Sequence, residues 1–170
     1  MSGKPITGQN AIEKLQAFAD KSFDVILCLG PLYHLYEQEE RDRCVKEIKR
    51  VCATNGTMFF AFINNDMVMI TQTMVYDPNY LETGNYNRKT FKVRNFPFVF
   101  DTIESARELL RRCGLTIEKE VASDGMNELL ADKVNALNEV AYQQWLQYHF
   151  HICEKPEFLG TSNHLLFICR

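Results

Sequence analysis

The segment FDVILCLGPLYHL, residues 23–35, contains the clearest structural signal in the sequence. Residues 23–29 form an apolar run of the length and composition typical of a strand buried on both faces. Gly30 and Pro31 then end the strand. Tyr33 and His34 follow directly, so two rings with polar groups lie where a buried strand ends.

In open α/β sheets, ligands bind at the carboxyl ends of the strands. Tyr33 and His34 are therefore candidate site residues. The alternative is that both rings only bridge core and solvent at the start of a helix. Position alone favours this alternative.

A helix over residues 38–52 is predicted next, after an acidic opening at residues 37–40 that suits a helix N-terminus. Its apolar residues share one stripe, and its basic residues lie mostly off it. The stripe comprises Val45, Ile48, Val51 and Cys52, and the basic residues are Arg41, Lys46, Lys49 and Arg50. We expect this helix to pack on a sheet through that stripe.

A second apolar strand is predicted over residues 57–63, and it runs into Asn64 and Asn65. Gly56, just before it, suits the left-handed conformation of a helix terminus or turn. The succession of strand, helix and strand predicts two parallel neighbouring strands with a right-handed crossover.

Residues 66–100 are irregular and rich in aromatic side chains. A helix over residues 67–74 and a strand over residues 88–93 are the elements that we expect within them. A long segment of this kind is often a lid or a binding insert. The alternative is a decorated edge of the sheet.

The remaining elements follow from capping residues and periodicity. Thr102 or Asp101 is expected to cap a helix that ends at Gly114. The last elements are a strand over 115–122, a helix over 126–151 in one or two pieces, and a final strand over 163–169. Near the start, we expect a short strand over 4–8 and a helix capped by Asn10.

Length and composition favour a single domain over residues 1–170, because 170 residues can build one hydrophobic core. Hydrophobic residues make up 46% and charged residues 24%, which is ordinary for globular proteins. The net charge of −3 lacks the basic excess of nucleic-acid-binding proteins. No apolar run suits a membrane span, and the N-terminus does not resemble a signal peptide, so we expect a cytoplasmic protein.

The six cysteines form no Cys-x-x-Cys pair, and most lie within apolar patterns. We therefore expect buried thiols rather than disulfides. His149, His151 and Cys153 alternate in a predicted helix, where residues two apart do not face each other, so no metal site is expected.

Three segments together resemble the class I S-adenosylmethionine-dependent methyltransferases. Residues 23–35 are similar to the fourth strand of this family and the motif that follows it. Residues 46–57 resemble the helix and turn before its fifth strand, with Thr54-Asn55-Gly56 in place of the usual Lys-Pro-Gly form. Residues 162–170 resemble its last strand.

The resemblance implies an α/β fold with part of the Rossmann-like methyltransferase sheet, from the third strand onward. Helices are expected on both faces of this sheet, with the irregular insert at about 66–100. The family order 3-2-1-4-5-7-6 leaves strands 4, 5, 7 and 6 contiguous. The first strand of the family, its glycine-rich turn and the acidic residue after its second strand have no counterpart in the sequence. The strand over 23–29 is therefore expected to be an unpaired edge, covered by a second copy, a swapped segment or the N-terminal residues.

The resemblance also implies a set of site residues. Gln9, Asn10 and Ala11 correspond to the segment that approaches the adenine of the cofactor, with Asn10 replacing the usual acid. Leu29, Gly30 and Leu32 are expected on the cofactor, and His34 and Tyr33 are candidate catalytic residues. Asn64 and Asn65 are expected to face the methyl acceptor.

Two functions remain open at this point. The first is methyl transfer from S-adenosylmethionine to a small-molecule acceptor by an enzyme that needs the N-terminal part of the family fold. The second is a truncated, non-catalytic methyltransferase-like remnant or interaction module that does not bind the cofactor alone. In both cases we expect homo-oligomers through the edge at 23–29, and neither a nucleic-acid nor a membrane partner.

Overall fold

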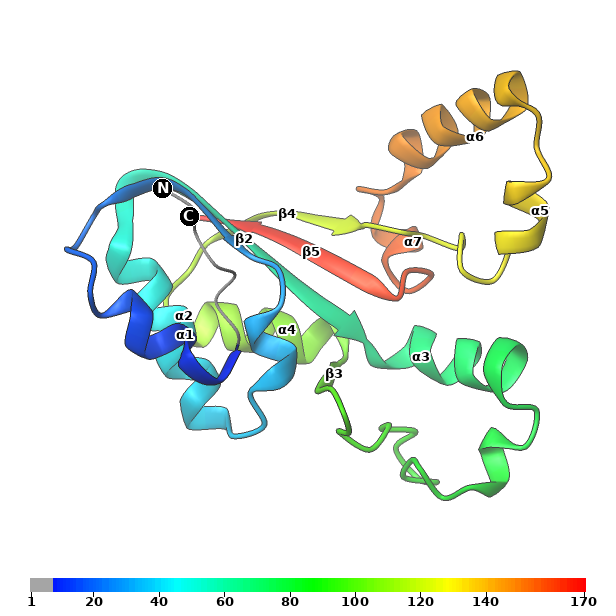
Figure 1. Cartoon of the computed structure of the whole chain (residues 1–170), viewed down its shortest axis with the longest axis horizontal. Helices are drawn as coiled ribbons and strands as arrows, with labels where there is room; N and C mark the ends of the chain where they lie inside the picture. The colour runs from blue at the N-terminus through cyan, green and yellow to red at the C-terminus, as the bar shows by residue number, and fades with distance from the viewer. Residues whose placement is uncertain (1–7) are drawn as a thin grey trace.

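A mixed sheet forms the centre of the protein, whose computed structural model describes residues 8–170 (Figure 1). Its spatial order is β1 (Phe23–Cys28), β2 (Cys52–Asn64), β5 (His164–Cys169) and β4 (Ile117–Ala122). Short β3 (Phe100–Asp101) pairs with the end of β2. β1 and β2 are parallel, and β5 is antiparallel to both of its neighbours. This order confirms the expected contiguity of family strands 4, 5, 7 and 6.

Helices connect the strands, and the described part of the chain contains none that is long and apolar enough to cross a membrane. Before the insert lie α1 (Gly8–Leu15), a 3-10 helix (Pro31–His34) and α2 (Gln38–Val51). The insert contains α3 (Asn65–Thr71), a π-helix (Gln72–Tyr76) and a 3-10 helix (Tyr80–Glu82). After it come α4 (Ile103–Arg112), α5 (Ala131–Asn135), α6 (Glu139–Ile152) and α7 (Pro156–Leu159).

The main core lies between the sheet and three helices, α1, α2 and α4, which share one side of the sheet (Figure 1). Its largest buried side chains on the sheet are Phe60, Phe62 and Phe167. The expected stripe of α2 is buried against them, as the periodicity predicted. All six cysteines are buried, and all are free thiols.

The opposite side of the sheet is open over β1. Val25 and Leu27 are 60% and 62% exposed. Leu27 is paired in register with Phe59, which is paired with Ile168, so these apolar side chains share the open face. The expectation of helices on both faces is therefore wrong for this part of the sheet, because no described helix packs over these side chains.

β1 is also an edge strand, since β2 is its only partner among the described residues. The expected unpaired edge is confirmed in this sense. The expectation of a strand buried on both faces is wrong, because one row of its side chains faces solvent.

Gly56 does not have the expected left-handed backbone, and β2 runs through it without a turn. A Cβ atom at this position would lie 2.6 Å from the Cys52 sulfur and 2.9 Å from the carbonyl oxygen of Asp24. Glycine is needed here because β1 and Cys52 approach it closely, not because of a turn.

One other predicted element is absent from the structure. Residues 88–93 form no strand: Asn87 accepts hydrogen bonds from the amides of Lys89 and Thr90, and the turn leaves a single bridge between Tyr86 and Val93. The segment 126–151, expected as a helix in one or two pieces, forms two helices, α5 and α6, whose apolar side chains are largely exposed, Val140 at 75%.

At the N-terminus, α1 begins at Gly8, so Asn10 lies in its first turn rather than at the expected cap. Of the strand expected over 4–8, residues 4–7 lie outside the described residues. Thr102 caps α4 as expected, and Gly114 has the left-handed backbone that ends it.

Candidate functional site

The turn after β1 brings three rings together. The ring centroid of Tyr33 lies 5.0 Å from that of His34 and 5.8 Å from that of Phe98. The amide of Val99 donates to the carbonyl of Tyr33 at 2.9 Å, so the insert is attached to this turn. The strand end and the insert therefore form one edge of the site.

The sequence-predicted residues of this turn have different environments. The Tyr33 hydroxyl donates to the Leu29 carbonyl at 2.7 Å, and burial raises the pKa of this phenol, so it remains a donor. His34 is exposed, and Leu29 is half exposed. Leu32 is fully buried in the main core, so its side chain does not face a ligand.

Asn64 and Asn65 are buried, and their side chains hold the chain rather than an open surface. The Asn64 amide donates to the Ser162 carbonyl at 3.0 Å, and its oxygen caps α3 by accepting from the amide of Asp66. Asn65 accepts from the amide of Val93 at 2.8 Å. These two residues fix segments that border the site, and they do not line its cavity.

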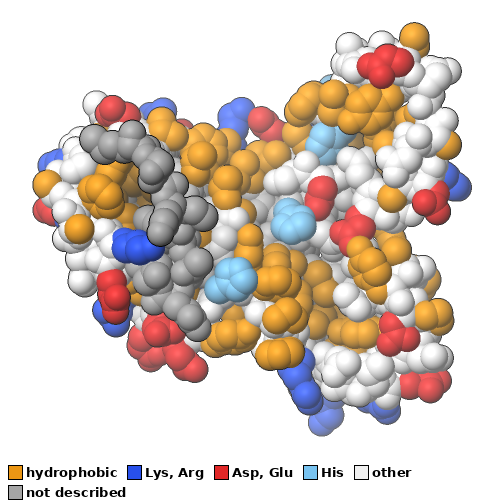
Figure 2. Space-filling model, in the orientation of Figure 1, with side chains coloured by type: hydrophobic (Ala, Val, Ile, Leu, Met, Phe, Trp, Pro, Cys, Tyr) orange, Lys and Arg blue, Asp and Glu red, His pale blue; other side chains and the backbone are white. Residues whose placement is uncertain are grey.

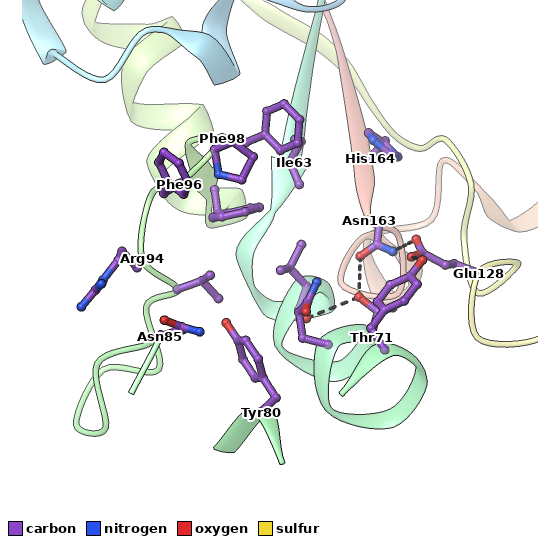
Figure 3. Close-up of a pocket in the computed structure, with 16 residues that line it drawn as sticks. Ile63, Thr71, Tyr80, Asn85, Arg94, Phe96, Phe98, Glu128, Asn163 and His164 are labelled. Carbon is purple, nitrogen blue, oxygen red and sulfur yellow. Dashed lines mark hydrogen bonds between the residues drawn. The ribbon is translucent and has the colours of Figure 1, made fainter. Parts of the chain in front are cut away.

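A cavity of about 750 Å³ lies at the ends of β2, β3 and β5 and is closed on one side by the insert (Figure 3). We name it the edge pocket. Aromatic and aliphatic side chains form one part of its wall, and polar side chains form another. The lining residues are Ile63, Val68, Thr71, Gln72, Tyr76, Tyr80, Asn85, Val93, Arg94, Phe96, Pro97, Phe98, Phe100, Glu128, Asn163 and His164.

The edge pocket lies between two arms of the molecule, one with α3 and the insert and the other with α5 and α6 (Figure 1). In Figure 2, hydrophobic side chains gather along both arms, and histidine and acidic side chains lie between them. Such a hollow, mostly apolar with a few polar groups, has the composition of a small-molecule site.

Sequence reasoning did not find the polar wall of this pocket. Glu128 accepts hydrogen bonds from the Tyr76 hydroxyl and from the Asn163 amide (Figure 3). His164 Nδ1 lies 2.7 Å from Asp124 Oδ2. These residues come from distant parts of the sequence, and the only signal for them was the position of Asn163 and His164 at the start of the last strand.

The histidine–aspartate pair shifts the pKa values of both groups. The hydrogen bond to Asp124 raises the pKa of His164. Burial would raise the pKa of Asp124, but hydrogen bonds from His164 and Ser162 outweigh it and lower that pKa. The pair is therefore held in its charged form over a wider pH range than either group alone.

A second hollow of about 550 Å³ follows the edge of β1, and we name it the β1 groove. Apolar residues of β1, α2 and the end of α1 line it, and it ends at Leu29, Gly30 and Pro31. The groove thus leads to the same strand end that carries Tyr33 and His34.

Comparison with known proteins decides the fold. Residues 4–60 match the family model described as a methyltransferase domain. A SAM-dependent methyltransferase from Archaeoglobus fulgidus has a TM-score of 0.54 and 15% identity, with 94% of this chain and 64% of that chain covered. The protein has a class I methyltransferase fold.

Two further solved structures agree. The CcbJ methyltransferase from Streptomyces caelestis has a TM-score of 0.52 at 10% identity, covering 90% of this chain and 59% of its own. A possible histamine N-methyltransferase from Thermotoga maritima has a TM-score of 0.51 at 16% identity, covering 89% and 57%. This methyltransferase-fold chain thus spans about 60% of the length of such structures, and no curated protein sequence matches it.

Two of these neighbours are described as SAM-dependent methyltransferases, and the lining of the β1 groove can be compared with what S-adenosylmethionine requires. The residues that the structure describes fit one side of this molecule. Leu29 and Gly30 end the β1 groove, and a Cβ atom on Gly30 would meet only the Tyr33 side chain, with the hydroxyl oxygen at 3.5 Å, so the backbone there is accessible. No carboxylate that could hold a ribose lines the groove in the described part of the chain. The side chains of Gln9, Asn10 and Ala11 lie outside the described part.

Proposed function

We propose that the protein takes part in methyl transfer from S-adenosylmethionine to a small molecule bound in the edge pocket. The observation that carries this proposal is the position of the pocket. Phe98 lines it and packs against Tyr33 and His34, at the strand end that the methyltransferase family model covers. Donor and acceptor would thus meet at the carboxyl edge of the sheet.

When bound, S-adenosylmethionine supplies a methyl group that is activated on a sulfonium sulfur. The protein then has to align the acceptor, and alignment provides much of the rate enhancement in such a reaction. Phe96, Phe98 and Tyr80 give the edge pocket aromatic walls that suit a planar acceptor. In this proposal, Leu29 and Gly30 contact the cofactor, and His34 lies between the two ligands.

Calorimetric and thermal titration with S-adenosylhomocysteine tests the cofactor part of the proposal. A ligand that binds only the folded state raises its stability once its concentration exceeds the dissociation constant. We expect the melting temperature to rise, and Leu29→Lys to weaken the rise because Leu29 ends the β1 groove. Phe150→Lys, on exposed α6, is the matched control and is expected to leave the rise unchanged. An unchanged melting temperature at millimolar ligand would contradict cofactor binding by this chain.

The second candidate function is a non-catalytic interaction module, and the exposed edge of β1 favours it. An apolar strand edge pairs readily with another chain. We propose that a second copy of the protein covers this edge in the cytoplasm, under either function. Light scattering is then expected to show a dimer that Leu27→Lys dissociates. A monomer with rapidly exchanging amides along residues 23–29 would contradict the association.

A further inference from the structure

We propose that His164, oriented by Asp124, accepts the proton of the methyl acceptor in the edge pocket. This inference rests on the proposed function, and it assigns the proton transfer to a residue pair that the sequence did not single out. The acceptor class that fits is a planar molecule with an ionisable O–H or N–H group.

His164 lies at the pocket because of the strand register. It is the first residue of β5 and is paired with Ile63 of β2, so both side chains lie on the same face of the sheet. Both line the edge pocket, and Figure 3 shows them at its upper wall. The His164 side chain is 53% exposed, so a ligand can reach it.

Asp124 contacts both the side chain and the backbone of His164. Its Oδ2 lies 2.7 Å from the imidazole Nδ1, and its Oδ1 accepts from the His164 backbone amide at 3.1 Å. A carboxylate at Nδ1 fixes the tautomer in which Nδ1 carries the proton and Nε2 carries a lone pair. No residue of the described part of the chain forms a hydrogen bond with Nε2, which therefore remains available to a ligand.

The aspartate is itself fixed by a buried serine. Ser162 Oγ accepts from the backbone amides of Asp124 and Gly125 at 3.1 and 3.0 Å. Ser162 is fully buried, and its carbonyl accepts a hydrogen bond from the side-chain amide of Asn64. The turn that carries Asp124 is thus attached to the end of β5, which limits the movement of the imidazole.

The charges around His164 favour a proton on its ring. The acidic groups that face it are Asp124 and Glu128, both from the segment after β4. The hydrogen bond to Asp124 and the charges of both carboxylates raise the pKa of His164 above its ordinary value. By contrast, His34 packs against Tyr33 and Phe98, and no carboxylate is bonded to it among the described residues.

One proton and one methyl group move in the proposed step. The O–H or N–H bond of the acceptor breaks and its proton goes to His164 Nε2, while the lone pair of the acceptor atom forms a bond to the methyl carbon. The bond between that carbon and the sulfonium sulfur breaks, and its electron pair stays on sulfur. The imidazolium that results is stabilised by the adjacent carboxylate.

A comparison of phenol and anisole as probes tests the role of His164. Both are planar, but only phenol can donate a proton to Nε2. NMR of the full chain with ¹⁵N-labelled histidine resolves four side chains, because the sequence has four histidines. We expect phenol, but not anisole, to shift the Nε2 signal of His164. At pH 8 we expect phenol to bind roughly 2- to 10-fold more tightly than anisole, the range for one hydrogen bond.

The preference for phenol is expected to disappear at pH 5, where the protonated imidazole has no acceptor. His164→Gln is expected to remove the pH dependence of this preference and to leave anisole binding unchanged. His151→Gln, on α6 and outside the pocket lining, is the matched control and should preserve the full effect. Asp124→Asn is expected to lower the measured pKa of His164 and to populate the other tautomer, which a purely structural role of Asp124 would not require.

The outcomes separate this inference from the proposed function. If both probes bind and a Phe96→Ala variant weakens their binding, but they bind equally and leave Nε2 unchanged, the role of His164 is wrong and the acceptor pocket stands. If neither probe binds at millimolar concentration, the acceptor pocket fails and the inference fails with it. Titration with S-adenosylhomocysteine tests the cofactor site independently of both.

Discussion

Among single residues, Arg41 and Asp101 form a buried ion pair that links α2 to β3, just before α4. Two nitrogens of Arg41 donate to the two carboxylate oxygens at 3.1 and 2.6 Å, and Ser105 donates to the same carboxylate at 2.9 Å. The side chains are 8% and 3% exposed. Removing one partner of such a pair leaves a buried charge without compensation.

We expect Asp101→Ala to lower the free energy of unfolding by about 3–5 kcal/mol, measured by urea denaturation. Replacing both partners, as Arg41→Met with Asp101→Leu, is expected to lose much less. Asp20→Ala, which removes an exposed partner of Arg50, is the control and should leave stability nearly unchanged. Equal losses in the single and double variants would contradict the account of the pair.

The close contact of Gly56 with Cys52 and β1 predicts the effect of a substitution at this position. We expect Gly56→Ala to lower the free energy of unfolding by about 1–3 kcal/mol, because the added methyl group collides with Cys52 and the β1 backbone. Gly160→Ala is the control, since a Cβ atom there meets nothing within 4 Å. Denaturation of both variants checks this, and an equal effect of the two substitutions would show that the close approach is unimportant.

Gly56, Arg41 and His164 show which features of single residues can be predicted from the sequence and which cannot. Gly56 was identified as special, but for a turn, because close contact between β1 and β2 has no local signal. Arg41 was expected off the apolar stripe, and its burial depends on Asp101, which lies 60 positions away. The His164–Asp124 pair is likewise 40 positions apart in sequence. Long-range polar pairs of this kind have no periodic pattern.

Among the helices, loss of the N-cap is expected to have different effects on stability in α4 and in α6. Thr102 accepts from the amide of Ser105 at 3.1 Å, and Asn138 accepts from that of Ala141 at 2.9 Å. Loss of an N-cap costs about 1 kcal/mol in helix stability. Helix α4 contributes Ala106 and Leu109 to the main core, whereas α6 is largely exposed.

We therefore expect Thr102→Ala to lower global stability by about 1 kcal/mol, seen in denaturation and in the exchange of core amides. Asn138→Ala is expected to speed amide exchange within α6 and to leave core amides unchanged. If Asn138→Ala accelerated exchange in β2 and β5, then α6 would belong to the main cooperative unit, against this expectation.

The elements that sequence predicted well have strong apolar patterns, as β1, α2 and β2 do, or a clear N-cap, as α4 does. The prediction failed over residues 88–93, where Asn87 binds two backbone amides and turns a β-like composition into a loop. The helical pattern over 126–151 did not show that the apolar side chains of α6 are largely exposed, because periodicity cannot show whether a partner is present to bury them.

For the molecule as a whole, the sheet has one covered and one open side over β1. The order of its strands followed from the family resemblance, because that order fixes which strands are neighbours. The edge pocket did not follow from the sequence, since it forms where the insert, the segment after β4 and the start of β5 meet. Its assembly depends on the packing of the two arms, which the sequence does not indicate locally.

Hydrogen–deuterium exchange of the full chain with and without S-adenosylhomocysteine tests the central claim most directly. If the carboxyl end of β1 holds the cofactor, the amides of residues 23–34 are expected to exchange more slowly when the ligand is present, while those of exposed α6 remain unchanged. Unchanged exchange along residues 23–34 at millimolar ligand, or protection confined to α6, would contradict the account.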